Sequence, residues 1–130
     1  MKDPRTLAVA EFIVAPESYK NADTALLFSV CNGCGSSQSK FDLVPDRIYG
    51  LDISPACFPH DWAYKFGKTK QDKQQADFDF LRNMLTLINN DTGFIGVMLK
   101  IPRRRRALKY YEAVNRFGDK AFWAGKTQVR

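Results

Sequence analysis

Apolar positions recur with helical spacing along most of the chain. Short apolar runs at 7–10 and 25–28 predict two short helices, over residues 5–15 and 22–31. A longer helix is predicted over 71–90, and another over 105–117 that ends at Gly118. The broad apolar face of the 71–90 helix comprises Ala76, Phe80, Met84, Leu87 and Ile88. Because strand patterns are scarce, the chain is predicted to be a small all-α domain.

A further helix is predicted between Ser54 and Gly67. Serine suits the N-cap, Pro55 suits the first helical position, and Gly67 is a suitable end. Pro59 removes one backbone donor, and we expect a distorted first turn there rather than a break. Residues 31–40 and much of 42–52 are rich in Asn, Gly, Ser and Pro, which predicts a long loop. Loops of this length are often functional.

Length and charge narrow the class of protein. A chain of 130 residues with 45% apolar residues predicts one folded domain over 1–130. Its N-terminal helical segment is expected within 1–20 and a frayed tail at 125–130. The net charge of +6 favours anionic partners, either acidic lipid surfaces or nucleic acid. No run is long enough for a membrane span or for the apolar core of a signal peptide, so we expect either that the protein is not secreted by that route or that the chain is a mature form with an added Met1.

His60 is the only histidine in the chain, and it titrates near neutrality. It lies next to Asp61 and one helical turn before Tyr64. Asp77 falls on the apolar face of the next helix, where a carboxylate needs hydrogen-bond partners. His60 and Tyr64 would satisfy it and leave the imidazole as a base. The alternatives are that His60 is only a packed helix residue, or that Asp77 faces solvent and Asp79 is the partner.

A second group of interest is the glycine-rich run 32–35, Asn-Gly-Cys-Gly. Glycines let a loop turn several carbonyls toward one centre, and Ca²⁺ prefers such oxygens together with a carboxylate. Asp61 would supply the carboxylate if Cys34 bonds Cys57, which lies one helical turn before it. The cysteine count is odd, so one pair and one thiol are expected in an oxidising compartment, and reduced or metal-bound thiols in the cytosol.

These motifs, in this order, resemble the secreted phospholipase A2 superfamily, most closely its bacterial and fungal branch. The resemblance spans about residues 32–118. It rests on Asn32-Gly33-Cys34-Gly35, Val44-Pro45-Asp46, Gly50, Asp52, Pro55-Ala56-Cys57, His60-Asp61-x-x-Tyr64, Ala76-Asp77-x-x-Phe80-Leu81 and Tyr110-Tyr111-x-Ala113-Val114-x-x-Phe117-Gly118.

The resemblance implies a catalytic apparatus on two antiparallel helices. His60 would be the general base that activates water, Asp77 would orient it, and Tyr64 would support that carboxylate. Cys34 and Cys57 would form the one disulfide, which ties a calcium loop to the first catalytic helix. The implied activity is hydrolysis of the sn-2 ester of glycerophospholipids.

The resemblance also implies a Ca²⁺ cofactor. Asp61 would be a bidentate ligand, and the carbonyl of Gly33 another. Gly35 would contribute a carbonyl, or an N–H to the oxyanion. Asn32 stands where relatives often carry an aspartate ligand, so a lower affinity for Ca²⁺ is expected. The ion would polarise the ester carbonyl.

Four consecutive arginines, Arg103, Arg104, Arg105 and Arg106, follow Pro102. One interpretation is a solvated helix face, and the other is contact with anionic lipid phosphates. Four cations near a helix N-terminus oppose the helix dipole, which favours an external anion. Aromatic residues elsewhere are expected mostly in the core: Trp62, Phe66, Phe122 and Trp123.

Three functions are therefore open. The leading hypothesis is a secreted or extracellularly delivered monomeric lipase that acts on anionic phospholipid surfaces, with no nucleic-acid partner. The second is a zinc module, because Cys31-x-x-Cys34 with Cys57-x-x-His60 supplies four ligands, and the arginines would contact nucleic acid. The third is an inactive, membrane-binding toxin with the lipase fold.

Overall fold

The chain is predominantly helical, as predicted. The computed structural model describes residues 13–30, 47–124 and 126. In these ranges it forms seven helices and one two-stranded antiparallel hairpin in which Arg47 pairs with Asp52. The elements are α1 (Glu17–Asn21), α2 (Thr24–Val30), β1 (Arg47–Ile48), β2 (Leu51–Asp52), α3 (Ser54–Phe66), α4 (Lys70–Asn90), α5 (Phe94–Met98), α6 (Lys100–Phe117) and α7 (Asp119–Trp123).

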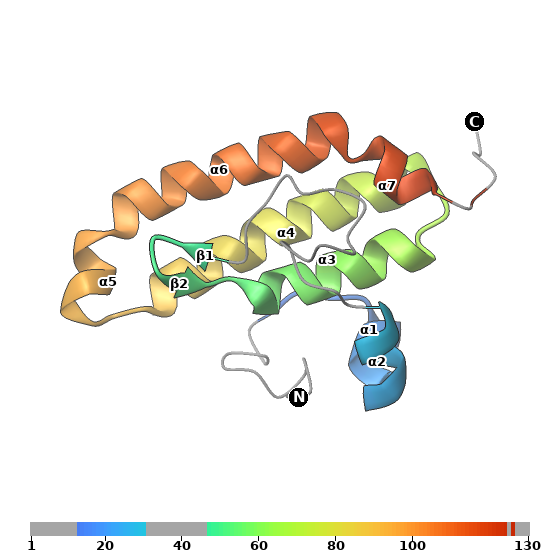
Figure 1. Ribbon diagram of the computed structural model, residues 1–130, viewed down its shortest axis with the longest axis horizontal. Coiled ribbons are helices and arrows are strands. Elements are labelled where there is room, and N and C mark those ends of the chain that lie inside the picture. The colour runs from blue at the N-terminus through green and yellow to red at the C-terminus, as the bar shows by residue number, and fades with distance from the viewer. Residues whose placement is uncertain (1–12, 31–46, 125, 127–130) are drawn as a thin grey trace.

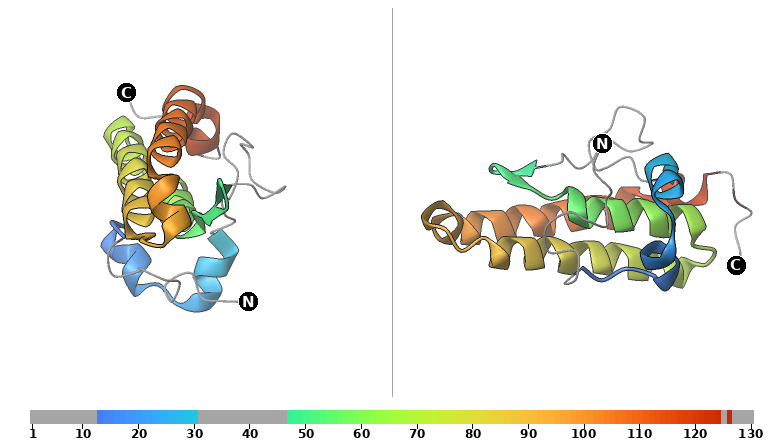
Figure 2. Two further views of the ribbon diagram at one scale, coloured as in Figure 1. Left: turned by 90° about the vertical axis from the view of Figure 1, so that its left-hand side faces the viewer. Right: turned by 90° about the horizontal axis from the view of Figure 1, so that it is seen from below.

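The three long helices lie side by side, with α4 packed against both α3 and α6 (Figure 1). Helices α1 and α2 lie beside α3 on the side away from α6, while α5 and α7 occupy opposite ends of the bundle (Figures 1 and 2). None of the helices in the described ranges combines the length and apolar character needed to cross a bilayer. The main core contains Ile13, Ile48, Ile53, Ala56, Cys57, Phe80, Met84, Leu87, Ile88, Ala107 and Val114.

Helices α3 and α4 form an antiparallel hairpin, joined by residues 67–69. Gly67 ends α3 as predicted, and its N–H donates to the carbonyl of Ala63 (2.8 Å). Thr69 begins α4 with a capping box, because its hydroxyl accepts from the N–H of Asp72 and that carboxylate accepts from Thr69 in return. The tight connection places the side chains of α3 directly against those of α4.

The start of α3 differs from the prediction by one residue. Ile53 occupies the N-cap position, Ser54 is already helical, and the carboxylate of Asp52 accepts the Ser54 N–H (2.9 Å). Asp52 therefore satisfies the first N–H of the helix, while the N–H groups of Ala56 and Cys57 donate to the Ile53 carbonyl. The helix continues through Pro59 without a break, as expected.

The predicted helix over 5–15 is wrong for residues 13–15, which form no helix, and its remainder lies outside the described residues. Asn83 explains the difference, since its buried side-chain amide accepts the Val14 N–H and donates to the Val14 carbonyl, both at 2.8 Å. These two bonds replace the helical partners of Val14. The first described helix, α1, begins only after Pro16, whereas α2 agrees with the helix predicted over 22–31.

Helix α6 begins five residues earlier than predicted, since Pro102 fits within its first turn. Its buried positions are Arg103, Ala107 and Val114. Leu108 and Phe117 are apolar residues of this helix, yet they are 47% and 65% exposed. The buried stripe thus runs through an arginine, which a pattern of apolar residues alone cannot reveal.

The burial of Arg103 corrects the interpretation of the arginine run. Its guanidinium donates to Asp91 Oδ2 (2.7 Å), to the Tyr49 carbonyl (2.7 Å) and to the Ile48 carbonyl (3.2 Å). These bonds tie α6 to the end of α4 and to the β-hairpin. Arg103 is therefore neither a solvated residue nor a lipid contact, and only Arg104, Arg105 and Arg106 remain as surface cations.

The Arg103→Gln variant is expected to lose about 2–4 kcal/mol of unfolding free energy, because three acceptors lose a charged donor in a buried place. Arg104→Gln is the matched control. Arg104 is exposed and donates to Asn89 Oδ1 (2.7 Å), so its loss is expected to stay within about 0.5 kcal/mol. Urea unfolding of both variants checks this, and equal midpoints would contradict it.

The aromatic side chains partly follow the expectation of core roles. Trp62 is buried and donates its indole N–H to Ser18 Oγ (2.9 Å), and Phe122 is fully buried. Trp123 packs at intermediate exposure on Phe122, whereas Phe66 is largely exposed. Phe66 is thus the one of these four that lies at the surface.

Candidate active site

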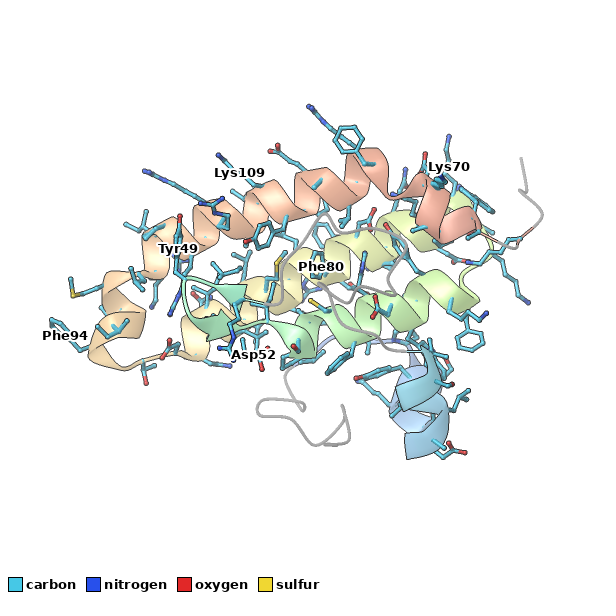
Figure 3. The ribbon with its side chains drawn as sticks, viewed as in Figure 1. Tyr49, Asp52, Lys70, Phe80, Phe94 and Lys109 are labelled. Carbon is cyan, nitrogen blue, oxygen red and sulfur yellow. The ribbon has the colours of Figure 1, made fainter. Side chains whose placement is uncertain are left out.

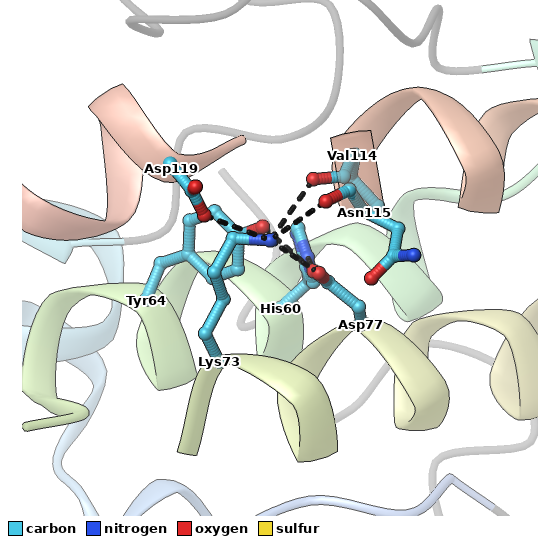
Figure 4. A network of polar contacts seen from close by, with 7 residues as sticks. All are labelled: His60, Tyr64, Lys73, Asp77, Val114, Asn115 and Asp119. Carbon is cyan, nitrogen blue, oxygen red and sulfur yellow. Dashed lines mark hydrogen bonds and ion pairs between the residues drawn. The ribbon is translucent and has the colours of Figure 1, made fainter. Parts of the chain in front are cut away.

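The predicted contact between His60 and Asp77 is confirmed (Figure 4). His60 Nε2 lies 2.9 Å from Asp77 Oδ1, and the hydroxyl of Tyr64 donates to the same oxygen at 2.6 Å. His60 and Tyr64 come from one face of α3, and Asp77 from the facing side of α4. All three residues are buried, Asp77 completely. The alternative in which Asp77 faces solvent is therefore wrong.

Lys73 completes the group, and the sequence analysis missed it. Its Nζ donates to Asp77 Oδ2 (2.7 Å) and to the carbonyls of Val114 (3.1 Å) and Asn115 (3.4 Å), and lies 3.6 Å from Asp119 (Figure 4). Both oxygens of Asp77 are thus engaged. The spacing of Lys73 and Asp77, four residues apart on a helix, was the signal that could have identified it.

The charges in this site follow from burial and partners. Burial alone would raise the pKa of Asp77, but hydrogen bonds from His60, Lys73 and Tyr64 outweigh it and hold that pKa below its usual value. Burial lowers the pKa of His60, although Asp77 opposes the change. Burial and the neighbouring Asp77 raise the pKa of Tyr64. At neutral pH the site therefore holds an ionised aspartate beside a neutral imidazole and a neutral phenol.

The ionised aspartate also fixes the imidazole tautomer. An ionised carboxylate only accepts hydrogen bonds, so Nε2 of His60 carries the ring proton and donates its hydrogen bond to Asp77. Nδ1 is then the basic nitrogen. The ring is clamped between Phe80, stacked at a centroid distance of 4.6 Å, and Tyr64 at 4.2 Å. The imidazole is thus held in one orientation with a defined base.

Two other aspartates named in the sequence analysis, Asp61 and Asp79, have different surroundings. Asp61 follows His60 on α3 at intermediate exposure, and adjacent residues of a helix point about 100° apart. Asp79, the alternative partner for His60, instead accepts from Gln75 Nε2 (2.8 Å) on the exposed side of α4. Asp77 is therefore the carboxylate that serves the imidazole.

The predicted calcium ligands are only partly described. Asp61 lies within the described residues, whereas Asn32, Gly33 and Gly35 lie outside them. In the described ranges no three His, Cys, Asp or Glu side chains gather in a metal-binding group. A calcium ion held by Asp61 would accordingly need further oxygens from elsewhere in the chain.

Cys57 is buried in the core and is disulfide-bonded. Both other cysteines, Cys31 and Cys34, lie outside the described residues, so the Cys34–Cys57 pairing stays a prediction. A cysteine in a disulfide has no thiolate to offer a metal. Together with the bond from His60 to Asp77, this weighs against the four-ligand zinc site.

Two hollows lie near the hairpin of α3 and α4. One of about 10 Å³ borders His60 and Asn83, which is room for one water molecule. The other, of about 240 Å³, lies between Pro16, Trp62 and Asp72 and does not touch His60. Neither of these two hollows offers a lipid-sized route to the imidazole.

Comparison with known proteins identifies no relative, since no family model, curated protein or solved structure matches this chain. The function is therefore inferred from the geometry of the described residues and from the sequence motifs.

Proposed function

We propose that this protein is a calcium-dependent phospholipase A2, which hydrolyses the sn-2 ester of glycerophospholipids to a lysophospholipid and a fatty acid. The observation that carries the proposal is the buried pair of His60 and Asp77, joined at 2.9 Å across α3 and α4. The motif resemblance, which includes these two residues together with the other motifs of residues 32–118, also supports it. A structural histidine alone would not require a fully buried carboxylate with three donors.

The proposed reaction uses His60 as a general base. Nδ1 takes a proton from water as the water oxygen forms a bond to the ester carbonyl carbon. Asp77 remains ionised and stabilises the imidazolium through Nε2–H. When the bond to the sn-2 oxygen breaks, the same proton passes from Nδ1 to that leaving oxygen. Tyr64 and Lys73 keep Asp77 oriented and charged throughout.

The residues available for calcium offer the hard oxygen ligands that this ion prefers. Asp61 would supply a carboxylate next to His60, and Asn32, Gly33 and Gly35 would complete the ligand set. A bound calcium ion would supply positive charge for the developing oxyanion.

Calcium removal is expected to lower fatty-acid release from phosphatidylglycerol and phosphatidylcholine vesicles by at least about tenfold, since the oxyanion loses its counter-charge. Substrate with a labelled sn-2 chain and a calcium chelator provide the measurement, and added calcium should restore the rate. Circular dichroism before and after chelation controls for unfolding.

Two results would contradict the proposal. Release of the sn-1 chain would assign a different ester specificity, and release insensitive to the chelator would remove the calcium requirement. If the folded protein releases nothing in either condition, the inactive membrane binder becomes the better description.

A further inference from the structure

The end of the molecule at α5 exposes an unusual amount of apolar surface. Large side chains project there into solvent, with Phe94 at the extreme end (Figure 3). We call this group the apolar tip. Its members, each between 58% and 78% exposed, are Phe94, Ile95, Val97, Met98 and Ile101. Contiguous exposed apolar residues of this kind mark interaction sites.

The position of the apolar tip is fixed by the packing of α5 against the end of α4. Gly96 is the buried residue of α5, and a Cβ added there would lie 2.2 Å from the Asp91 carbonyl oxygen and 2.5 Å from Asp91 Cγ. Only glycine therefore fits against the end of α4. Asp91 is in turn held by buried Arg103 at 2.7 Å. This close packing at Gly96 fixes α5 with its large side chains directed outward.

Cations follow the apolar tip along α6. Residues 94–111 contain six lysines and arginines and no acidic residue. One of the six, Arg103, is buried. The exposed members, which we call the cationic collar, are Arg104, Arg105, Arg106 and Lys109.

An exposed aromatic residue adjoins the collar. Tyr49 is 48% exposed, and its hydroxyl accepts from Arg106 at 2.8 Å. Its φ of 45° lies in the left-handed region that suits glycine, so a large side chain is kept here despite backbone strain. A tyrosine beside arginines suits the headgroup level of a bilayer.

We propose that the apolar tip and the cationic collar dock this protein on an anionic phospholipid bilayer. The apolar side chains would enter the acyl boundary, and the collar would contact lipid phosphates. A second copy fits less well, because a two-fold contact through the tip would bring two cationic collars together. Nucleic acid would match the collar but leave the apolar tip in water.

The docking surface is separate from the candidate active site. Asp77 and Asn90 are 13 residues apart on α4, a distance of roughly 20 Å. Attachment and hydrolysis can therefore be measured independently. The inference deepens the proposed function, and it rests on that proposal for lipid as the partner.

Two exposed phenylalanines provide a matched test. Phe94 lies in the apolar tip and Phe117 at the far end of α6, and both are mostly exposed. On vesicles of equimolar phosphatidylcholine and phosphatidylglycerol, Phe94→Glu is expected to weaken partitioning by about tenfold or more. Phe117→Glu makes the same chemical change and is expected to alter partitioning less than about twofold. Vesicle flotation measures both.

A second pair of conditions tests the collar. Changing Arg104 and Arg105 together to glutamine should weaken binding to the mixed vesicles and leave binding to pure phosphatidylcholine unchanged. The inference is overturned if both phenylalanine variants lose binding equally, or if Phe94→Glu loses none. It is also overturned if the wild-type protein dimerises without lipid and Phe94→Glu dissociates that dimer.

Hydrolysis of a monomeric short-chain phospholipid separates this inference from the proposed function. Phe94→Glu should hydrolyse it at the wild-type rate. One outcome is that neither the wild type nor the variants hydrolyse this substrate, while Phe94→Glu alone loses vesicle binding. The docking surface is then supported and the proposed function is wrong. If hydrolysis persists but the wild-type protein does not bind vesicles, the docking surface fails.

Discussion

Replacing His60 by glutamine is expected to lower phospholipid hydrolysis by about two to four orders of magnitude, because the reaction loses its general base. The fold should persist, since the glutamine amide can still donate to Asp77 in a site already formed by Tyr64 and Lys73. Rates of fatty-acid release, together with thermal melts of both proteins, provide the measurement. Undiminished release from the folded variant would reject the proposed mechanism.

The pH dependence gives a second readout for the same residue. Burial lowers the pKa of His60 below 6.5, so the acid limb of kcat/KM should fall below that value. Between the folded pKa and pH 6.5, the unfolded chain therefore binds a proton at His60 that the folded chain does not bind. The stability associated with neutral His60 is therefore complete above pH 6.5 and is lost as pH falls through the folded pKa.

His60→Gln should lack this component of the acid destabilisation. Melting temperatures of both proteins between neutral pH and about pH 5 test it. A variant whose melting temperature falls as steeply as that of the wild type would show that His60 is not the titrating group.

Replacing Lys73 by methionine is expected to destabilise the fold by about 3–5 kcal/mol, because it leaves the buried carboxylate of Asp77 without its cation. Lys73 also lowers the pKa of His60, so its removal should move the acid limb of kcat/KM to higher pH. A purely structural role would change stability alone. Urea unfolding and the pH–rate profile measure the two effects separately.

Two further variants sharpen this test. Lys73→Arg keeps the positive charge, so the acid limb of its kcat/KM profile should lie close to the pH found for the wild type. Asp77→Asn combined with Lys73→Met removes the uncompensated carboxylate, so the double variant should be less destabilised than the sum of the single losses. Simple additivity would mean that the two side chains do not interact, contrary to their 2.7 Å contact.

The contact between His60 and Asp77 was predictable because it depends on helical periodicity. One histidine, and one aspartate on an apolar helix face, could be matched from helical spacing alone. The four-residue spacing places Lys73 beside Asp77 on the same helix, but it does not predict burial, because a lysine in an amphipathic helix ordinarily faces water. Its burial is decided by the carbonyl of Val114, 41 residues further along the chain.

The burial of one residue in the arginine run could likewise not be predicted from the sequence. Four consecutive arginines have identical sequence character, yet successive helical residues point about 100° apart, so one of them turns inward. Which one turns inward depends on where Asp91 and the β-hairpin lie, and their positions are set by the tertiary structure. The extended path of Val14 depends likewise on distant Asn83.

The short connection between α3 and α4 also bears on how the site is assembled during folding. His60 and Asp77 are 17 residues apart, so their meeting closes a short loop, whereas Lys73 must close 41 residues to reach Val114. The longer closure carries an entropic penalty only about 0.8 kcal/mol larger, but it also requires α6 to have docked. His60 and Asp77 can therefore meet as soon as α3 and α4 pair, whereas Lys73 reaches its carbonyl acceptor on α6 only when the whole bundle has closed.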